Sequence, residues 1–271
     1  MNLLVDSHCH ILDERVADRA EEIVANFEKD GIAFVVEIGA TYGESIKAVA
    51  FAKKHEKVFA TIGIHPHYAG GYFSCRDCED NKERHSDFEV FARGQKENKK
   101  VVAIGECGLD YYHMHSDRAS QKEAFIRQIK LAHELGLPLV VHSRDAFQDT
   151  FDILWEHKDL LKNEVLLHCF SYGVPEVSQF LRLQDAYFAF GGAITYKNVD
   201  GAKQAVLAVP RDRLLIETDS PYLSPVPLRG STNEPKNVKY VAEKISEILG
   251  ISYNEVCRQT HDNAKRFYDI N

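Results

Sequence analysis

Eight short apolar runs, mostly of β-branched residues, constrain the fold of this 271-residue chain more than any other feature. Helical-period segments separate them, such as Ser120–Leu135, which carries apolar residues at i, i+4 and i+7 and is followed by Gly136. Strands that alternate with helices pair in parallel and are covered on both faces. The runs are Leu3–Asp6, Phe34–Ile38, Val58–Ile64, Val101–Gly105, Pro138–Val141, Val165–Leu167, Tyr187–Phe190 and Leu214–Glu217.

Eight such units predict an α/β fold of the TIM-barrel type, a closed (β/α)₈ barrel formed by one domain over residues 1–271. A doubly wound open sheet is the competing topology, but DSHCH (Asp6–His10) stands where its glycine-rich phosphate turn would follow the first strand. Asn233–Leu249 and Ser252–Tyr268 are expected to be two further helices that complete the outer layer. The polar stretch 65–101 is expected to be a long loop followed by a helix.

Composition excludes several classes of protein. The net charge of −8 argues against a broad surface for duplex DNA, because such surfaces neutralise many phosphates with Lys and Arg. No secretion signal or apolar stretch of membrane-spanning length is present, so the expected compartment is the cytoplasm, with no membrane contact. Six irregularly spaced cysteines indicate reduced thiols and not a disulfide framework.

Ligand-type side chains follow six of the eight runs. In a parallel barrel these positions converge on one mouth, where barrel enzymes have their active sites. A lone histidine at such a place is more often a hydrogen-bonded core residue, but seven coincidences are better explained together. The residues are His8 and His10 after the first run, His65 after the third, Glu106 after the fourth, His142 after the fifth, His168 after the sixth and Asp219 after the eighth.

Imidazole and carboxylate ligands without a cysteine cage suit a divalent ion such as zinc, manganese or nickel. Six candidate ligands exceed what one catalytic zinc needs and suit two ions bridged by a carboxylate and a hydroxide. Because alternate strand residues point the same way, His8 and His10 can bind one ion together, with Cys9 facing outward.

Seven segments of the chain resemble the TatD family of metal-dependent deoxyribonucleases, which are metallo-dependent hydrolase barrels. The resemblance covers almost the whole chain, and the set of motifs is specific. The segments are DSHCH (Asp6–His10), GIHPH (Gly63–His67), GECGLDYY (Gly105–Tyr112), HSRDA (His142–Ala146), HCFSYG (His168–Gly173), ETDSPYL (Glu217–Leu223) and NEP (Asn233–Pro235).

The resemblance implies a role for each matching position. It implies that His8, His10 and Asp219 hold one metal, that His142 and His168 hold the second, and that Glu106 bridges the two. His65 would contact substrate, and Arg144 would meet a phosphate oxygen, a role that suits its planar charge. The family often has an arginine after the paired tyrosines, where this chain reads YYHMH (Tyr111–His115), so the substrate contacts of that loop do not carry over.

The expected reaction is hydrolysis of DNA phosphodiesters by a metal-bridging hydroxide, with two divalent ions (Mg, Mn or Zn) and Asp219 as proton acceptor. An acidic protein with a small mouth suits single strands or strand ends, and the resemblance implies 3′ to 5′ exonuclease action without deciding against endonuclease action. No obligate protein partner is inferred. Tyr112 and Phe170 could stack a base, with packing of the loops as the equal alternative.

Three weaker patterns sit outside this set. Cys75 and Cys78 have the spacing of half a zinc site, with His67 and His85 as conceivable partners, although such a pair more often has no role. His113 and His115 repeat the HxH spacing, follow no apolar run and are interpreted as loop residues. Asp110 and Asn263 are expected to fix loops by hydrogen bonds.

Two other functions remain open. A metal-dependent amidohydrolase or deacylase could use the same scaffold on an ester such as a misacylated aminoacyl ester. That class commonly bridges its metals with a modified lysine at the fourth strand, where this chain has Glu106. A non-catalytic metal-binding or partner-binding barrel is disfavoured, because all six ligand positions are intact.

Overall fold

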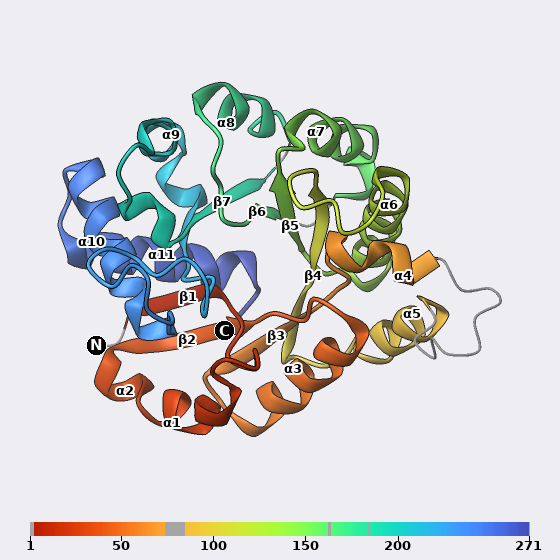
Figure 1. Ribbon diagram of the computed structural model, residues 1–271, viewed down its shortest axis with the longest axis horizontal. Coiled ribbons are helices and arrows are strands. Elements are labelled where there is room, and N and C mark those ends of the chain that lie inside the picture. The colour runs from red at the N-terminus through yellow and green to blue at the C-terminus, as the bar shows by residue number, and fades with distance from the viewer. Residues whose placement is uncertain (1–2, 74–84, 162–163, 184, 271) are drawn as a thin grey trace.

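The computed structural model describes residues 3–73, 85–161, 164–183 and 185–270. Within them the eight predicted runs form one parallel eight-stranded sheet, in which neighbours in sequence are neighbours in space. Figure 1 shows these strands surrounding a common centre with helices outside them. The predicted (β/α)₈ barrel is therefore confirmed. The strands are β1 (Leu4–Cys9), β2 (Ile32–Glu37), β3 (Val58–Ile62), β4 (Val101–Asp110), β5 (Leu139–Arg144), β6 (Val165–Leu167), β7 (Ala186–Phe190) and β8 (Leu214–Ile216).

Helices cover the outside of the strands. Helix α6 begins at an N-cap, Asp117, whose carboxylate accepts from the amides of Ala119 and Ser120, and it ends at Gly136, which has a φ of 71°. The α-helices are α1 (Ala20–Ala25), α2 (Phe27–Asp30), α3 (Tyr42–Lys54), α4 (Ala69–Phe73), α5 (His85–Gly94), α6 (Arg118–Leu135), α7 (Phe147–Glu156), α8 (Val174–Phe180), α9 (Asp200–Ala208), α10 (Val238–Leu249) and α11 (Tyr253–Phe267). The 3₁₀ turns are η1 (Ala17–Arg19), η2 (Pro66–Tyr68), η3 (Lys158–Leu160), η4 (Gly192–Thr195), η5 (Arg211–Arg213) and η6 (Pro235–Asn237).

Hydrogen bonds connect the first strand to the segment after the last one. The amide of Asp219 donates to the carbonyl of His8 at 2.9 Å, and the amide of His10 donates to the carbonyl of Ser220 at 2.7 Å. In the same contact between β1 and the segment after β8, the Asp6 carboxylate accepts a hydrogen bond from the amide of Thr218 at 2.8 Å. These bonds thus bring the first strand and the segment after the last strand together, although about 210 residues separate them in sequence.

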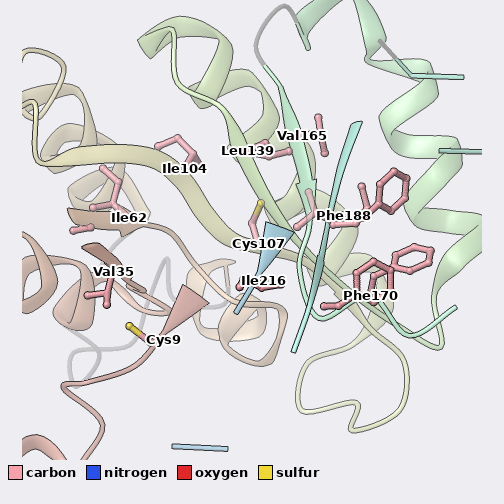
Figure 2. Close-up of a cluster of buried hydrophobic side chains, with 14 of the residues drawn as sticks. Cys9, Val35, Ile62, Ile104, Cys107, Leu139, Val165, Phe170, Phe188 and Ile216 are labelled. Atoms are coloured by element: carbon pink, nitrogen blue, oxygen red, sulfur yellow. The ribbon is translucent and has the colours of Figure 1, made fainter. Parts of the chain in front are cut away.

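The apolar side chains form two layers because strand residues alternate in direction. The layer between strands and helices contains residues such as Val35, Val165 and Ile216, together with Cys9 and Cys107 (Figure 2). The second layer fills the barrel and contains the alternate strand residues, including Val36, Leu166, Tyr187 and Leu215. Cys9 therefore faces outward, as expected, and its thiol points to the carbonyl of Val36 at 3.4 Å.

The last helix does more than complete the outer layer. Phe267 and Tyr268, at the end of α11, pack into the interior layer, and the Tyr268 hydroxyl donates to the carbonyl of Ser7. Asn263 donates to the carbonyls of Arg211 and Leu214, at the start of β8, which confirms its predicted role. The end of α11 therefore lies among the starts of the strands and leaves the opposite end of the barrel for the site.

Two segments differ from expectation. The stretch after His65 is not only a loop, because η2 and α4 form there before α5. Cys75 and Cys78 lie outside the described residues. Strand β4 continues to Asp110, five residues beyond the predicted Gly105, so that the YYHMH segment follows a strand end directly. Among the described residues, no helix has the length and apolar character needed to cross a membrane.

Candidate metal centre

The predicted ligands meet at the carboxyl ends of the strands, around the side chain of Glu106. This side chain on β4 is 4 % exposed, and four imidazoles surround it. The distances from its carboxylate oxygens are 2.8 Å to His142 Nδ1, 2.8 Å to His168 Nε2, 3.4 Å to His65 Nε2 and 3.4 Å to His8 Nε2. Imidazoles from four strands or strand ends therefore converge on one carboxylate of a fifth strand, which is the place predicted for a bridging ligand.

Asp219 forms the second focus of the site. Its Oδ1 lies 3.5 Å from His10 Nε2 and 3.7 Å from His8 Nε2. Asp219 has a φ of 55°, a left-handed conformation at the turn that follows β8. The side chains of His10 and Asp219 are 15 % and 16 % exposed, whereas His8 is fully buried. The group of His8, His10 and Asp219 therefore opens toward solvent, and Glu106 lies beneath it.

Glycine at position 108 allows β4 and β5 to approach beside the site. Gly108 has a φ of 131°, and it pairs with His142 in the sheet. A Cβ placed there would lie 2.1 Å from the carbonyl oxygen of His142, a distance that no side chain tolerates. The close approach fixes the backbone of His142 relative to the strand that carries Glu106.

Burial and neighbouring charges shift the pKa values of the site's imidazoles in opposite directions, down for His8 and His65 and up for His10, His142 and His168. Burial would raise the pKa of Glu106, but the surrounding imidazoles, His168 and His65 foremost, hold it well below its usual range. Burial lowers the pKa of His8, and it lowers the pKa of His65 to about 4, so both rings are neutral near pH 7. Burial also opposes the charged form of His10, yet Asp219 outweighs it and raises the pKa of His10 to about 9.

The surroundings of the His8 ring show whether these residues fit a metal ion. Both of its ring nitrogens are buried and have no hydrogen-bond partner among the described residues, although Nε2 faces Glu106 at 3.4 Å, and the ring stacks on His168 with centroids 3.8 Å apart. Buried polar atoms without partners are costly in a folded protein. A divalent cation among His8, His10 and Asp219 would use one of those lone pairs, so the donor set fits the group. His65, Glu106 and His142 form another set of atoms within metal-binding reach.

Three buried carboxylates that the sequence reasoning did not assign hold the ligands in place. Glu217 accepts from the amide of Cys169 at 2.7 Å and lies 3.2 Å from His168 Nδ1. Glu37 accepts from the amides of Ile11 and Leu12, directly after His10. Asp6 accepts the hydrogen bond from Thr218 that joins β1 to the segment after β8. Outer partners of this kind set the orientation of metal-binding imidazoles. Glu37 and Glu217 could have been found, since each lies at the end of an apolar run.

The remaining predicted residues lie at the rim or apart from it. His65 is as near to Glu106 as His8 is, so its position suits contact with either metal or substrate. Arg144, at the end of β5, is exposed, and its guanidinium carbon lies 4.3 Å from the ring centre of Tyr112. Tyr112 is 61 % exposed, as a base-stacking residue requires. Phe170 is not available for a base, because it is buried against Phe188 and other aromatic rings.

Comparison with known proteins gives one consistent result. The family described as TatD related DNase matches residues 5–269. The metal-dependent hydrolase YabD of Bacillus subtilis is 36 % identical, with 99 % of this chain and 100 % of YabD covered. The metal-dependent hydrolase YcfH of Escherichia coli K12 is 35 % identical, with 98 % of this chain and 96 % of YcfH covered.

Solved structures agree in fold. YjjV, a TatD homologue from Escherichia coli K12, has a TM-score of 0.87 at 22 % identity, covering 100 % of this chain and 99 % of its own. A TatD family hydrolase from Entamoeba histolytica has a TM-score of 0.83 at 19 % identity, covering 98 % and 97 %. The chain therefore belongs to the TatD related DNase family, and it is similar over its whole length to YabD and YcfH, which are named as metal-dependent hydrolases.

Proposed function

We propose that this protein hydrolyses phosphodiester bonds of DNA, acting on single strands or strand ends with two divalent metal ions. The observation that supports this most is the ligand set itself: four imidazoles and two carboxylates, from His8, His10, His142, His168, Glu106 and Asp219, at the mouth of one barrel. Two divalent ions held by two carboxylates leave a net positive charge, which attracts an anionic phosphodiester.

The metal ions, when bound, would polarise the phosphoryl group and lower the pKa of a water molecule. The protein's own residues supply the rest. Asp219, on the solvent side of His8, would accept a proton from the attacking water and orient it. Arg144 would neutralise a phosphate oxygen at the rim, where its planar group can donate two hydrogen bonds.

Several arginine–tyrosine stacks at this end of the barrel support a single-stranded substrate. Arg15 lies 3.9 Å from the ring centre of Tyr222, Arg144 lies 4.3 Å from that of Tyr112, and Arg229 lies 4.4 Å from that of Tyr196. Such pairs offer a flat surface to a base. Arg144 and Arg229 also offer a positive charge to a phosphate, whereas the charge of Arg15 is paired with Asp13. Tyr222 also contacts His10 edge-on, with ring centroids 6.0 Å apart, so one stack adjoins the centre.

The decisive experiment is a substrate panel. The protein, loaded with magnesium, manganese or zinc, is offered 5′- and 3′-labelled single-stranded and duplex DNA, and an aminoacyl ester in parallel. We expect cleavage of single-stranded DNA, and we expect Glu106→Ala and Asp219→Asn to reduce it by more than about 100-fold, since even outer partners of metal ligands contribute 10- to 100-fold.

The control and the contrary outcomes are defined by the same panel. Asp200→Asn, in which the replaced side chain is 87 % exposed on α9, should keep wild-type activity. Unchanged DNA cleavage in Glu106→Ala and Asp219→Asn would refute the assigned site. Turnover of the ester alone would refute the nuclease proposal and leave the metal centre standing.

A further inference from the structure

A second cluster of ligand-type side chains lies beside the metal centre, around Asp110. This carboxylate ends β4, and its side chain is 1 % exposed. Its Oδ2 is 3.0 Å from His67 Nε2, 3.1 Å from His113 Nδ1 and 3.0 Å from His142 Nε2. One carboxylate oxygen therefore faces nitrogens of three imidazoles. The proposed function uses His142 alone among these three.

The hydrogen-bonding capacity of Asp110 is smaller than this arrangement demands. An ionised carboxylate has about four lone-pair positions, two on each oxygen. The Oδ1 atom already accepts from the amides of Tyr112 and His113, at 3.0 and 2.8 Å. Two positions thus remain on Oδ2 for three imidazole nitrogens. If all three imidazoles donate N–H groups, Oδ2 faces one more donor than it has lone-pair positions.

A cation among His67, His113 and Asp110 resolves the mismatch. The two imidazoles then direct lone pairs to the cation, and Oδ2 uses one position for the cation and the other for the N–H of His142. Ligand atoms about 2.1 Å from a tetrahedral zinc lie about 3.4 Å apart. The nitrogen–oxygen distances of 3.0 and 3.1 Å are already within a few tenths of an ångström of that separation, and the three ligand atoms lie within 4.8 Å of one another.

The surroundings are those of an open site. The side chains of His67 and His113 are 26 % and 39 % exposed, so coordination positions remain for water or another ligand. The ring of His115 lies 4.5 Å from that of His67, centroid to centroid, and can approach as a further ligand. Arg144 pairs with Asp110 in the sheet, which places the cluster next to the rim residue that would meet a phosphate.

We propose that His67, Asp110 and His113 bind a third divalent cation of the zinc type, separate from the two-metal centre and linked to it through the Asp110–His142 hydrogen bond. The ion would join the loop after β4 to η2, which follows β3. It would also present a positive charge beside Arg144. The proposal depends on the cluster's own geometry and holds for any substrate of the neighbouring centre.

Counting bound zinc tests the proposal directly. Protein freed of metal with a chelator is saturated with zinc, desalted and measured by elemental analysis, with cobalt absorption as a second readout. We expect His113→Ala to bind one zinc fewer than the wild type. His113 is exposed, so this variant should fold, and its thermal midpoint checks that. His157→Ala, at the carboxyl end of α7, is the histidine control and should keep wild-type stoichiometry.

The same comparison in a variant with a disabled main centre separates zinc bound at the Asp110 cluster from zinc bound at that centre. In Glu106→Ala/Asp219→Asn, which disables the bridging and mouth ligands, adding His113→Ala should again remove one zinc. Retention of the full zinc count by His113→Ala in either background would overturn the proposal. Loss of an equivalent from His157→Ala would do the same, because the histidine effect would then not be local.

Discussion

Helix α6 fixes two strand ends of the site through a pair of buried carboxamides, and this arrangement yields a quantitative prediction. Gln121 is fully buried; its Oε1 accepts from the amide of Asp110 at 2.8 Å. Its Nε2 donates to the carbonyls of Asp110 and Ser116, at 3.0 and 2.8 Å. Two turns further along α6, Gln128 bonds the amide and carbonyl of Ile64 in the same way, at 2.8 and 2.9 Å.

Replacing Gln121 by Leu keeps the side chain's approximate size and removes all three hydrogen bonds. One backbone amide and two carbonyls would then be buried without partners, and each such group costs about 1–3 kcal/mol. Because these contributions share one site and do not add fully, we expect a loss of about 3–5 kcal/mol in the free energy of unfolding. For a chain of this size, that corresponds to a fall of about 10 °C in the thermal midpoint.

Urea unfolding measures the effect, with the fluorescence of the single tryptophan, Trp155, as the signal. A chelator is present throughout, so that metal binding does not contribute to the difference. Gln148→Leu is the control, because Gln148 is exposed and its side chain donates to Asp152 of its own helix. A loss below about 1 kcal/mol for Gln121→Leu, or a loss equal to that of the control, would refute the reasoning.

Three further predictions concern charge and metal. The bonds that Asp13 accepts from Arg15 lower the pKa of Asp13 to about 2, below the ordinary 3.8, so its stabilisation is complete above the ordinary value and is lost as pH falls through about 2. The unfolding free energies of wild type and Asp13→Asn should therefore differ by about 1 kcal/mol at pH 7 and converge near pH 2; a gap independent of pH would contradict this. Arg144→Lys should raise KM for single-stranded DNA about tenfold with a smaller change in kcat, since lysine lacks the planar fork and the stacking on Tyr112; an unchanged KM would remove Arg144 from substrate binding. Zinc at a hundred times its Kd should stabilise the protein by about 2.7 kcal/mol per site in calorimetry, and a Glu106→Ala protein with the same zinc response would contradict the assigned bridge.

The fold and most of the candidate centre could be predicted because both depend on local patterns. An apolar run long enough for one strand is visible in sequence, and eight of them alternating with helical segments admit few topologies. Parallel strands then direct their carboxyl ends to one face, so His8, Glu106 and Asp219 could be assigned to a common site before any coordinates. Their roles as metal ligands remain predictions.

What sequence patterns missed has a physical explanation in each case. Strand β4 runs past Gly105 because glycine lets it lie close to β5, although glycine and acidic residues weaken a strand pattern. Phe170 was grouped with the mouth because it follows a strand, yet its ring packs inward against other aromatic rings. Neither the direction of a side chain nor its neighbours on other strands is encoded in the spacing of residues along the chain.

The sequence by itself determined that the chain forms a barrel and which residue types gather at its mouth, because hydrophobic periodicity and strand-end position are properties of short segments. Only the tertiary structure decided which of those residues contact one another. It gave Glu106 four imidazole neighbours, left the nitrogens of His8 without hydrogen-bond partners among the described residues, and placed His67 and His113 on the same carboxylate oxygen as His142. These are distances between segments far apart in the chain, and they arise only when the barrel closes.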